Sequence, residues 1–473
     1  MATFQQRSAR LLKDVKRLLS SINPPKNAGA EIATRIMRAS EGNEPRTWHQ
    51  RQLSPPTAAG PNSAVAAVSR SSDHMEVVWI GDDGWVHGRR WTEASDWQKQ
   101  YQIPGSEKAS KTGGITALSR SSDHMEVWWI GEDGSVQGAW WTEAEKDWQR
   151  PAAPVAGTNN ASGGIASVSR SSTDMEVLWV GKSGSVRAAR WTRAGGWENP
   201  ETVVAANVSE QGGIAALSLN ASHMEVWWIK NDHSVQGAYW TEETDAWTVA
   251  ANPLATDTAS KTGSIAAVSR GASNMEVLWI GKGGTVQAAH WTESGGWRKP
   301  YEVAPAGQAS TSSSIAALSR NPSHIEVWWH VDERVQDASW TEEAGWQDHY
   351  QIAQAAAPNG GIAALTRYST HMEVWWPGKD KSVQGAWWQD NPPPPIHGRP
   401  LKYFTGTLPY ASEVFGVYKP LARGWAGKSN IALLTPVVLG GAQADDYPSA
   451  DLSDVTDEIL PLRALSTAVA AVP

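Results

Sequence analysis

The sequence of 473 residues contains no cysteine, which excludes disulfide bonds, thiolate metal sites and cysteine nucleophiles. It also has no apolar run of the roughly 18 residues that a membrane-spanning helix needs, so no transmembrane segment is expected. The N-terminal stretch MATFQQRSARLLKDVKRLLSSI interrupts its leucines with Lys and Arg, unlike a Sec signal peptide. We therefore expect a cytoplasmic protein or one released by a non-classical route. The net charge of −8 gives no indication of a nucleic-acid partner.

Phenylalanine and tyrosine are scarce, at 3 and 9 residues, whereas tryptophan reaches 29. An internal repeat explains this imbalance. The second of seven copies begins at Gly113 and reads GGITALSRSSDHMEVWWIGEDGSVQGAWWTEAEKDWQRP. One glutamate recurs every 47 to 51 residues, at Glu76, Glu126, Glu176, Glu225, Glu276, Glu326 and Glu373.

Three positions of the repeat are tryptophan in every copy. The first column is Trp79, Trp129, Trp179, Trp228, Trp279, Trp329 and Trp376. The second column is Trp91, Trp141, Trp191, Trp240, Trp291, Trp340 and Trp388. The third column is Trp97, Trp148, Trp197, Trp247, Trp297 and Trp346, with Trp48 upstream of the first copy as its seventh member.

Each copy is predicted to form four short strands. In the second copy ITALSR, MEVWWI, SVQGAWW and DWQRP are separated by turns, and Asp-Gly and Gly-Gly pairs mark the second turn in several copies. Four strands in a unit of roughly 40–50 residues are typical of a propeller blade. The first strand is rich in Ala and Ser and the later ones in Trp, which fits a blade that widens outward. We predict an all-β fold, a seven-bladed β-propeller of four-stranded blades.

The seventh copy ends before its fourth strand, in a proline run at 392–395 that cannot join a central ladder. Upstream of the first copy, PRTWHQRQLSPP carries Trp48 where that strand is missing. We predict that residues 46–53 complete the seventh blade beside the strand of Trp388. An N-terminal strand would then close the ring.

Three regions are expected along the chain. Residues 45–397 form the propeller, and residues 398–473 form a C-terminal extension that is partly disordered. Residues 1–44 form a basic amphipathic helical segment, since Phe4, Leu11, Val15, Leu18 and Ile22 recur at helical spacing. Residues 1–51 carry a net charge of +6, from ten Lys+Arg and four Asp+Glu. Such a helix docks on a protein partner, an acidic surface or a membrane, or packs on its own propeller.

Candidate binding residues surround the first turn of each copy, in the pattern Ser-Arg-x-x-x-His-x-Glu followed by Trp. A His and a Glu two apart on a strand share a face with the following Trp. Charged hydrogen-bonding groups beside an indole suit a sugar, whose hydroxyls pair with the polar groups while its C–H face lies on the ring. The position before the second tryptophan column varies and adds further candidates. The predicted ligand-binding set is Arg70, His74, Glu76, Arg120, His124, Glu126, Trp140, His223, Glu225, Tyr239, Arg320, His324, Glu326, Arg367, His371, Glu373 and Trp387.

These residues also have structural interpretations. The repeated glutamate can tie one blade to the next through backbone N–H groups, and the invariant tryptophans are favoured as core because blades need bulk between them. A His-x-Glu pair can ligate a metal, but two ligands without a third at fixed spacing are a weak signal. We expect no metal and no cofactor. Seven similar edges suit multivalent binding better than catalysis, which needs one asymmetric site, so we do not expect an enzyme.

Repeats of the form SRxxxHMEVWWIGxDGSVQGAxW resemble the propeller lectins of bacteria and fungi, the fucose-specific lectins and those of the Photorhabdus type. The resemblance covers roughly residues 45–390. It implies binding of fucose or related, sometimes O-methylated, saccharides in crevices between blades, with glycans as partners. The alternative is a scaffold for protein–protein contacts that docks on a larger assembly, such as a secretion or toxin particle, through its terminal segments.

Overall fold

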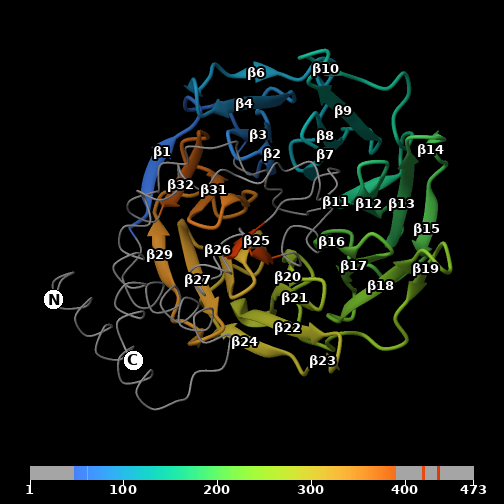
Figure 1. The fold of residues 1–473 in the computed structure, drawn as a ribbon, viewed down its shortest axis with the longest axis vertical. Coiled ribbons are helices and arrows are strands. Elements are labelled where there is room, and N and C mark those ends of the chain that lie inside the picture. Colours follow the sequence, from blue (N-terminus) through green and yellow to red (C-terminus); the bar gives the residue numbers. More distant parts are fainter. Residues whose placement is uncertain (1–46, 61, 390–417, 421–433, 437–473) are drawn as a thin grey trace, which may run out of the picture.

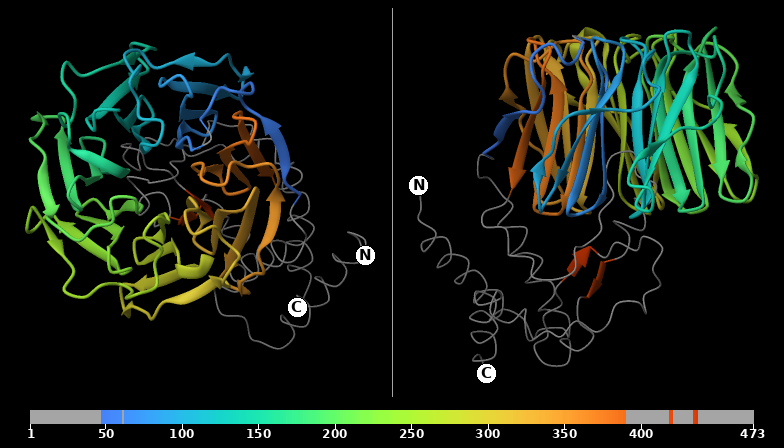
Figure 2. Two further views of the ribbon diagram at one scale, coloured as in Figure 1. Left: turned by 180° about the vertical axis from the view of Figure 1, so that it is seen from behind. Right: turned by 90° about the horizontal axis from the view of Figure 1, so that it is seen from above.

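The computed structural model describes residues 47–60, 62–389, 418–420 and 434–436. Seven antiparallel sheets stand around a central axis, each with its first strand innermost, so the predicted seven-bladed propeller is confirmed (Figure 1). Seen edge-on, the strands of all blades run roughly along the axis of the ring (Figure 2). The blades are numbered 1 to 7 in chain order from β2.

The strands fall into four positions from the axis outward. The innermost strands are β2 (Val65–Ser71), β7 (Ile115–Ser121), β11 (Ala161–Ser171), β16 (Ile214–Asn220), β20 (Ile265–Gly271), β25 (Ile315–Asn321) and β30 (Ala363–Tyr368). The second strands are β3 (His74–Ile80), β8 (His124–Ile130), β12 (Asp174–Gly181), β17 (His223–Ile229), β21 (Asn274–Ile280), β26 (His324–Val331) and β31 (His371–Pro377). The third strands are β4 (Val86–Thr92), β9 (Val136–Thr142), β13 (Ser185–Thr192), β18 (Val235–Thr241), β22 (Val286–Thr292), β27 (Arg334–Thr341) and β32 (Val383–Gln389).

The outermost strand is continuous in some blades and broken into two pieces in others. The continuous ones are β19 (Ala246–Val249) and β1 (His49–Gln52). In blade 2 it is the short β10 (Trp148–Gln149), followed by a separate bridge between Ala156 and Val136. The broken ones are β5 (Asp96–Trp97) with β6 (Tyr101–Gln102), β14 (Gly196–Trp197) with β15 (Glu201–Val204), β23 (Gly296–Trp297) with β24 (Tyr301–Ala304), and β28 (Gly345–Trp346) with β29 (Tyr350–Ala353). Outside this pattern lie the 3₁₀ turn η1 (Lys282–Gly284) and the pair β33 (Tyr418–Pro420) and β34 (Leu434–Pro436).

Local hydrogen bonds explain why each copy turns where it does. In blade 2 the Ser119 hydroxyl donates to the carbonyl oxygens of Ser121 and His124, at 2.7 and 2.8 Å, and so fixes the first turn. In the second turn the Asp133 carboxylate accepts from the Ser135 backbone N–H at 2.9 Å. Gly134 follows Asp133 with a φ of 74°, a left-handed conformation that favours glycine.

The hydrophobic core lies between neighbouring blades. All seven tryptophans of the first column are at most 1% exposed, which confirms their assignment to the core. Trp129 of blade 2, for example, packs in one cluster with Val78 and Val86 of blade 1. Each blade therefore buries its apolar faces against the two blades beside it, and a closed ring leaves no blade without a neighbour.

The N-terminal strand closes the ring as predicted. β1 pairs with β32, with His49 opposite Trp387 and Arg51 opposite Gly385 (Figure 1). Trp48 Nε1 donates to the Asp337 carboxylate at 3.1 Å and to the Tyr350 hydroxyl oxygen at 3.0 Å, both in blade 6.

The predicted helical segment 1–44 lies outside the described residues, as does most of the 398–473 extension, and the boundaries at 45 and 397 remain predictions. Within the described part of the chain, no helix is long and apolar enough to cross a membrane.

Candidate functional site

The arginine of each first strand reaches into the next blade. Arg120 Nη1 donates to the Ser172 carbonyl oxygen at 2.9 Å, and its guanidinium lies 4.1 Å from the ring centroid of Trp191. The other arginines make the same two contacts: Arg70 with Ser122 and Trp141, Arg170 with Ala221 and Trp240, Arg270 with Pro322 and Trp340, Arg320 with Ser369 and Trp388, and Arg367 with Ser72 and Trp91. Blade 4 has Leu219 at this position. These arginines therefore tie the blades together, whatever else they bind.

The repeated glutamate is buried in the same crevice, and its partners differ from blade to blade. Arg120 donates to Glu126 Oε1 through Nε and Nη2, at 2.7 and 2.6 Å. Glu126 Oε2 is also buried and has no hydrogen-bond partner. Burial raises the pKa of Glu126, and the charge of Arg120 opposes that rise. This carboxylate oxygen is a hydrogen-bond acceptor that the protein itself leaves unsatisfied.

A pocket of about 340 Å³ opens beside this oxygen, between blades 2 and 3. It brings together four residues predicted from the sequence, Arg120, His124, Glu126 and Trp140. The other lining residues are Trp128, Gly138, Ala139, Pro151 and Val155 of blade 2 and Met175, Trp191 and Trp197 of blade 3. The pocket is thus walled by indoles and polar on one side, which is the arrangement expected for a saccharide.

Sequence reasoning missed the walls that Trp191 and Trp197 form, because both belong to columns assigned to the core. Trp141 and Trp240 are buried, whereas Trp191 and Trp197 are partly buried. They pack against the core between blades 2 and 3 and also line the pocket. A position that is tryptophan in every copy is interpreted as core from the sequence. Only the packing of the neighbouring blade shows which face of the indole lines a pocket.

The other predicted clusters occupy the equivalent crevices. In blade 1, Glu76 Oε2 contacts His74 Nε2 at 3.0 Å and Arg90 Nε at 3.2 Å, and Arg70 pairs with Glu143. In blade 6, Arg320, His324 and Glu326 are buried together, and the His324 and Glu326 side chains lie 2.6 Å apart.

Blade 4 keeps a more open version of the cluster, whereas Arg367, His371 and Glu373 of blade 7 are buried. In blade 4, His223 Nε2 lies 3.0 Å from Glu225 Oε1, and its ring stacks on Tyr239, which is 37% exposed. In blade 7, His371 lies 3.2 Å from Arg367 and 3.0 Å from Glu373. Here the Arg51 guanidinium covers Trp387, 3.9 Å from its ring centroid.

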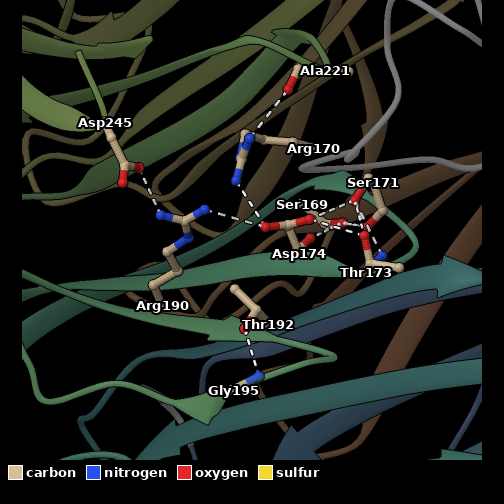
Figure 3. Close-up of polar contacts among 10 residues, drawn as sticks. All are labelled: Ser169, Arg170, Ser171, Thr173, Asp174, Arg190, Thr192, Gly195, Ala221 and Asp245. Atoms are coloured by element: carbon tan, nitrogen blue, oxygen red, sulfur yellow. Dashed lines mark hydrogen bonds and ion pairs between the residues drawn. The ribbon is translucent and has the colours of Figure 1, made fainter. Parts of the chain in front are cut away.

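The crevice after blade 3 is bridged by ion pairs. Asp174 replaces the histidine and accepts from Arg170 at 2.8 Å and from Arg190 at 3.3 Å (Figure 3). Arg190 also reaches Asp245 of blade 4 at 2.7 Å. Burial raises the pKa of Glu176 to about 7, and Trp247 Nε1 of blade 4 donates to that carboxyl at 3.0 Å.

The residue of the outermost strand that faces the crevice decides whether the space is filled. In three blades it is a tyrosine, and the register pairs Tyr101 with Gly88, Tyr301 with Ala288 and Tyr350 with Asp337. The phenol of Tyr101 donates to Glu76, and that of Tyr301 donates to Glu276. Blades 3, 4 and 7 place Glu201, Ala250 and Arg51 at this register position. In blade 2 Pro151 lines the pocket.

The turn histidines differ in burial. His74, His324 and His371 are at most 1% exposed and belong to the interior, whereas the side chains of His124 and His223 are about a quarter exposed. In the described part of the chain, no group of three or more acidic or histidine side chains is placed to hold a metal ion.

The buried side chain of His330 makes the stability of this fold sensitive to acid. Desolvation lowers the pKa of His330 to about 4, from an ordinary value of 6.5. Between pH 6.5 and 4 this histidine is protonated in the unfolded chain but neutral in the folded chain. The free energy of unfolding therefore falls as pH falls through this range, by roughly 1.4 kcal/mol per pH unit. We expect wild type to lose stability relative to His330→Gln over this range in urea unfolding. Parallel pH profiles of the two proteins would contradict this assignment.

Comparison with known proteins agrees with the resemblance seen in the sequence. Residues 160–391 match the family described as fungal fucose-specific lectin. The BP39L lectin from Burkholderia pseudomallei superposes with a TM-score of 0.62 at 17% identity, covering 71% of this chain and 99% of that one. The lectin of Aleuria aurantia, described as a six-bladed β-propeller with a novel fucose recognition mode, gives a TM-score of 0.49 at 18% identity, covering 63% and 97%. No curated protein matches the sequence significantly.

Proposed function

We propose that this chain, whose residues 160–391 match the fungal fucose-specific lectin family, is a multivalent, non-catalytic lectin. It binds fucose or a related, O-methylated saccharide in crevices between its blades. The observation that carries the proposal is the pocket between blades 2 and 3, where Glu126 Oε2 lacks a partner and four tryptophans are among the lining residues. A volume of about 340 Å³ is at the lower end for ligand sites and suits one or two sugar rings.

The chemistry of the pocket fits a deoxy sugar. The Glu126 carboxylate accepts a hydroxyl hydrogen, and His124 and Arg120 line the same polar side. Trp128, Trp191 and Trp197 offer apolar faces on which the C–H groups and the methyl of a fucose ring pack. A charged carboxylate buried between indoles gains most from a ligand that supplies a donor and an apolar edge together.

Two further crevices support multivalency. Blades 4 and 7 share with blade 2 a tryptophan in the second strand opposite a glycine of the third, as in Trp128 with Gly138, Trp227 with Gly237 and Trp375 with Gly385. They also carry the predicted Tyr239 and Trp387 where blade 2 has Trp140. The crevices are unequal, because blade 4 lacks the arginine and blade 7 adds Arg51.

Binding is expected to be weak for a single sugar and strong on a surface. A shallow site for one ring predicts a dissociation constant of about 10 µM to 1 mM for methyl α-L-fucoside in calorimetry. Linked sites raise the effective concentration, so retention on a dense fucose surface should be ~10²-fold tighter. A glycan array identifies the sugar if fucoside fails. An array without any bound glycan would contradict the lectin proposal.

Glu126→Gln is expected to remove one fucoside site per chain from the calorimetric stoichiometry. A hydrogen bond to a charged group contributes about 1.5–3 kcal/mol, so affinity at that site should fall roughly 10- to 100-fold. The matched control is Glu276→Gln, because Tyr301 already occupies that carboxylate. Equal stoichiometry and affinity in wild type and Glu126→Gln would place the ligand elsewhere.

The scaffold alternative rests on residues 1–44 and 398–473, most of which lie outside the described ones. No contact of the described residues favours it.

A further inference from the structure

Three of the seven crevices are occupied by a phenol from the same chain. In blade 5 the Tyr301 hydroxyl donates to Glu276 and accepts from Trp346 Nε1 of blade 6 at 3.0 Å. In blade 6 the Tyr350 hydroxyl accepts from Trp48 Nε1 of blade 7 at 3.0 Å. One phenol oxygen is therefore held between the two blades, by a carboxylate of one and an indole N–H of the next.

The open pocket holds the same groups without the phenol. Glu126 occupies the repeat position of Glu276, and Trp197 of blade 3 occupies that of Trp346. Pro151, three residues after Trp148, lines the pocket, and no tyrosine is among the lining residues. Glu126, whose Oε2 has no partner in blade 2, occupies the same repeat position as Glu276, which accepts the Tyr301 hydroxyl in blade 5.

Burial keeps the phenols of Tyr101 and Tyr350 protonated. Desolvation and the neighbouring carboxylate raise the pKa of Tyr101 well above its ordinary value. The hydroxyl therefore remains a donor, as an alcohol of a sugar would. The ring of Tyr101 also lies against Gly88, so closely that a Cβ there would clash with it.

We propose that Tyr101, Tyr301 and Tyr350 are internal ligands that close three binding crevices. Each phenol takes the place that a saccharide ring takes in the open pocket, and its hydroxyl makes the contacts of a ligand hydroxyl. The identity of the saccharide rests on the proposed function, whereas the occupation of the crevice by the phenol does not. The number of working sites is then set by the outer-strand residue and not by the number of blades.

Blade 5 is the best place to test this, because it keeps the arginine, glutamate and neighbouring-blade tryptophan of the open pocket. Arg270 lies 4.2 Å from the ring centroid of Trp340 and donates to the Pro322 carbonyl oxygen, as Arg120 does with Trp191 and Ser172. Removing the Tyr301 ring would release one oxygen of Glu276, while the other stays 3.1 Å from His290 Nδ1.

The experiment compares wild type, Tyr301→Ala and Tyr301→Phe by calorimetry with methyl α-L-fucoside. Tyr301→Ala should bind one fucoside more per chain than wild type. Tyr301→Phe keeps the ring, so the crevice stays closed and the number should equal that of wild type. A folded Tyr301→Ala protein with an unchanged number of sites would overturn the proposal.

A second ligand separates this proposal from the identity of the sugar. The probe is 4-methylphenol, the side chain of tyrosine as a free molecule, which should bind Tyr301→Ala saturably and raise its melting temperature without affecting wild type. If wild type binds no fucoside, the proposed sugar is wrong, and the 4-methylphenol experiment alone tests the internal-ligand role. A Tyr301→Ala protein that does not bind 4-methylphenol would overturn that role.

The converse variant covers the case in which Tyr301→Ala does not fold. Pro151→Tyr places a phenol at the open pocket, and blade 6 shows that a tyrosine there is compatible with a neighbouring tryptophan, since it has both Trp328 and Tyr350. One fucoside site should be lost. A folded Pro151→Tyr protein with every wild-type site intact would overturn the proposal.

Discussion

Deleting residues 1–54 is expected to prevent the propeller from folding. The deletion removes β1, the outermost strand of blade 7, and leaves the β32 edge unpaired. It also removes Trp48, which is bonded to blade 6, and Leu53, which is 1% exposed in the core between blades 7 and 1. Emptying one large aromatic and one leucine site costs roughly 3–5 and 2–5 kcal/mol, which together approach the whole stability of a typical domain.

The matched control is a deletion of residues 1–40, which leaves β1 and Trp48 in place and should keep the melting temperature of the full chain. Thermal unfolding followed by tryptophan fluorescence reports both variants. If the 1–54 deletion melts cooperatively at the temperature of the full chain, the ring does not depend on this closure.

Trp141→Ala is expected to destabilise the protein by about 3–5 kcal/mol, the usual cost of emptying a large aromatic site. Trp141 is 1% exposed and packs in the cluster between blades 1 and 2. The guanidinium groups of Arg70 and Arg90 from blade 1 lie 4.6 and 5.2 Å from its ring centroid, so the substitution also removes contacts that hold the two blades together.

The control is Trp297→Ala, because Trp297 is 36% exposed and its loss should cost clearly less in the same denaturant titration. The two substitutions remove the same atoms, but Trp141 is buried and in contact with two arginines, whereas Trp297 is exposed. A Trp141→Ala protein as stable as wild type that no longer binds sugar would move this position from the core to the ligand site.

The number of blades, their strand order and the closure of the ring could all be read from the sequence. Each copy carries its own alternation, its own turn residues and its own tryptophans, and these are local features that act within about 50 residues. Trp48 was recognisable because it filled the one gap in an otherwise complete column. Arg120, His124, Glu126 and Trp140 were recognisable together because they share one face of neighbouring strands.

Only the tertiary structure decided which crevice is open and what closes the others. The walls of the pocket come from two blades, so Trp191 and Trp197 acquire their role from a neighbour that no single repeat contains. The arginines act across the same boundary, which is why their tie to the next blade was not visible in the sequence. The outer strand breaks between Trp97 and Tyr101 but runs unbroken from His49 to Gln52, so the residue facing the glutamate comes four positions after the tryptophan in blade 1 and three in blade 7. Strand register is set by packing across the whole blade, and it places a phenol in one crevice and leaves a carboxylate oxygen without a partner in another.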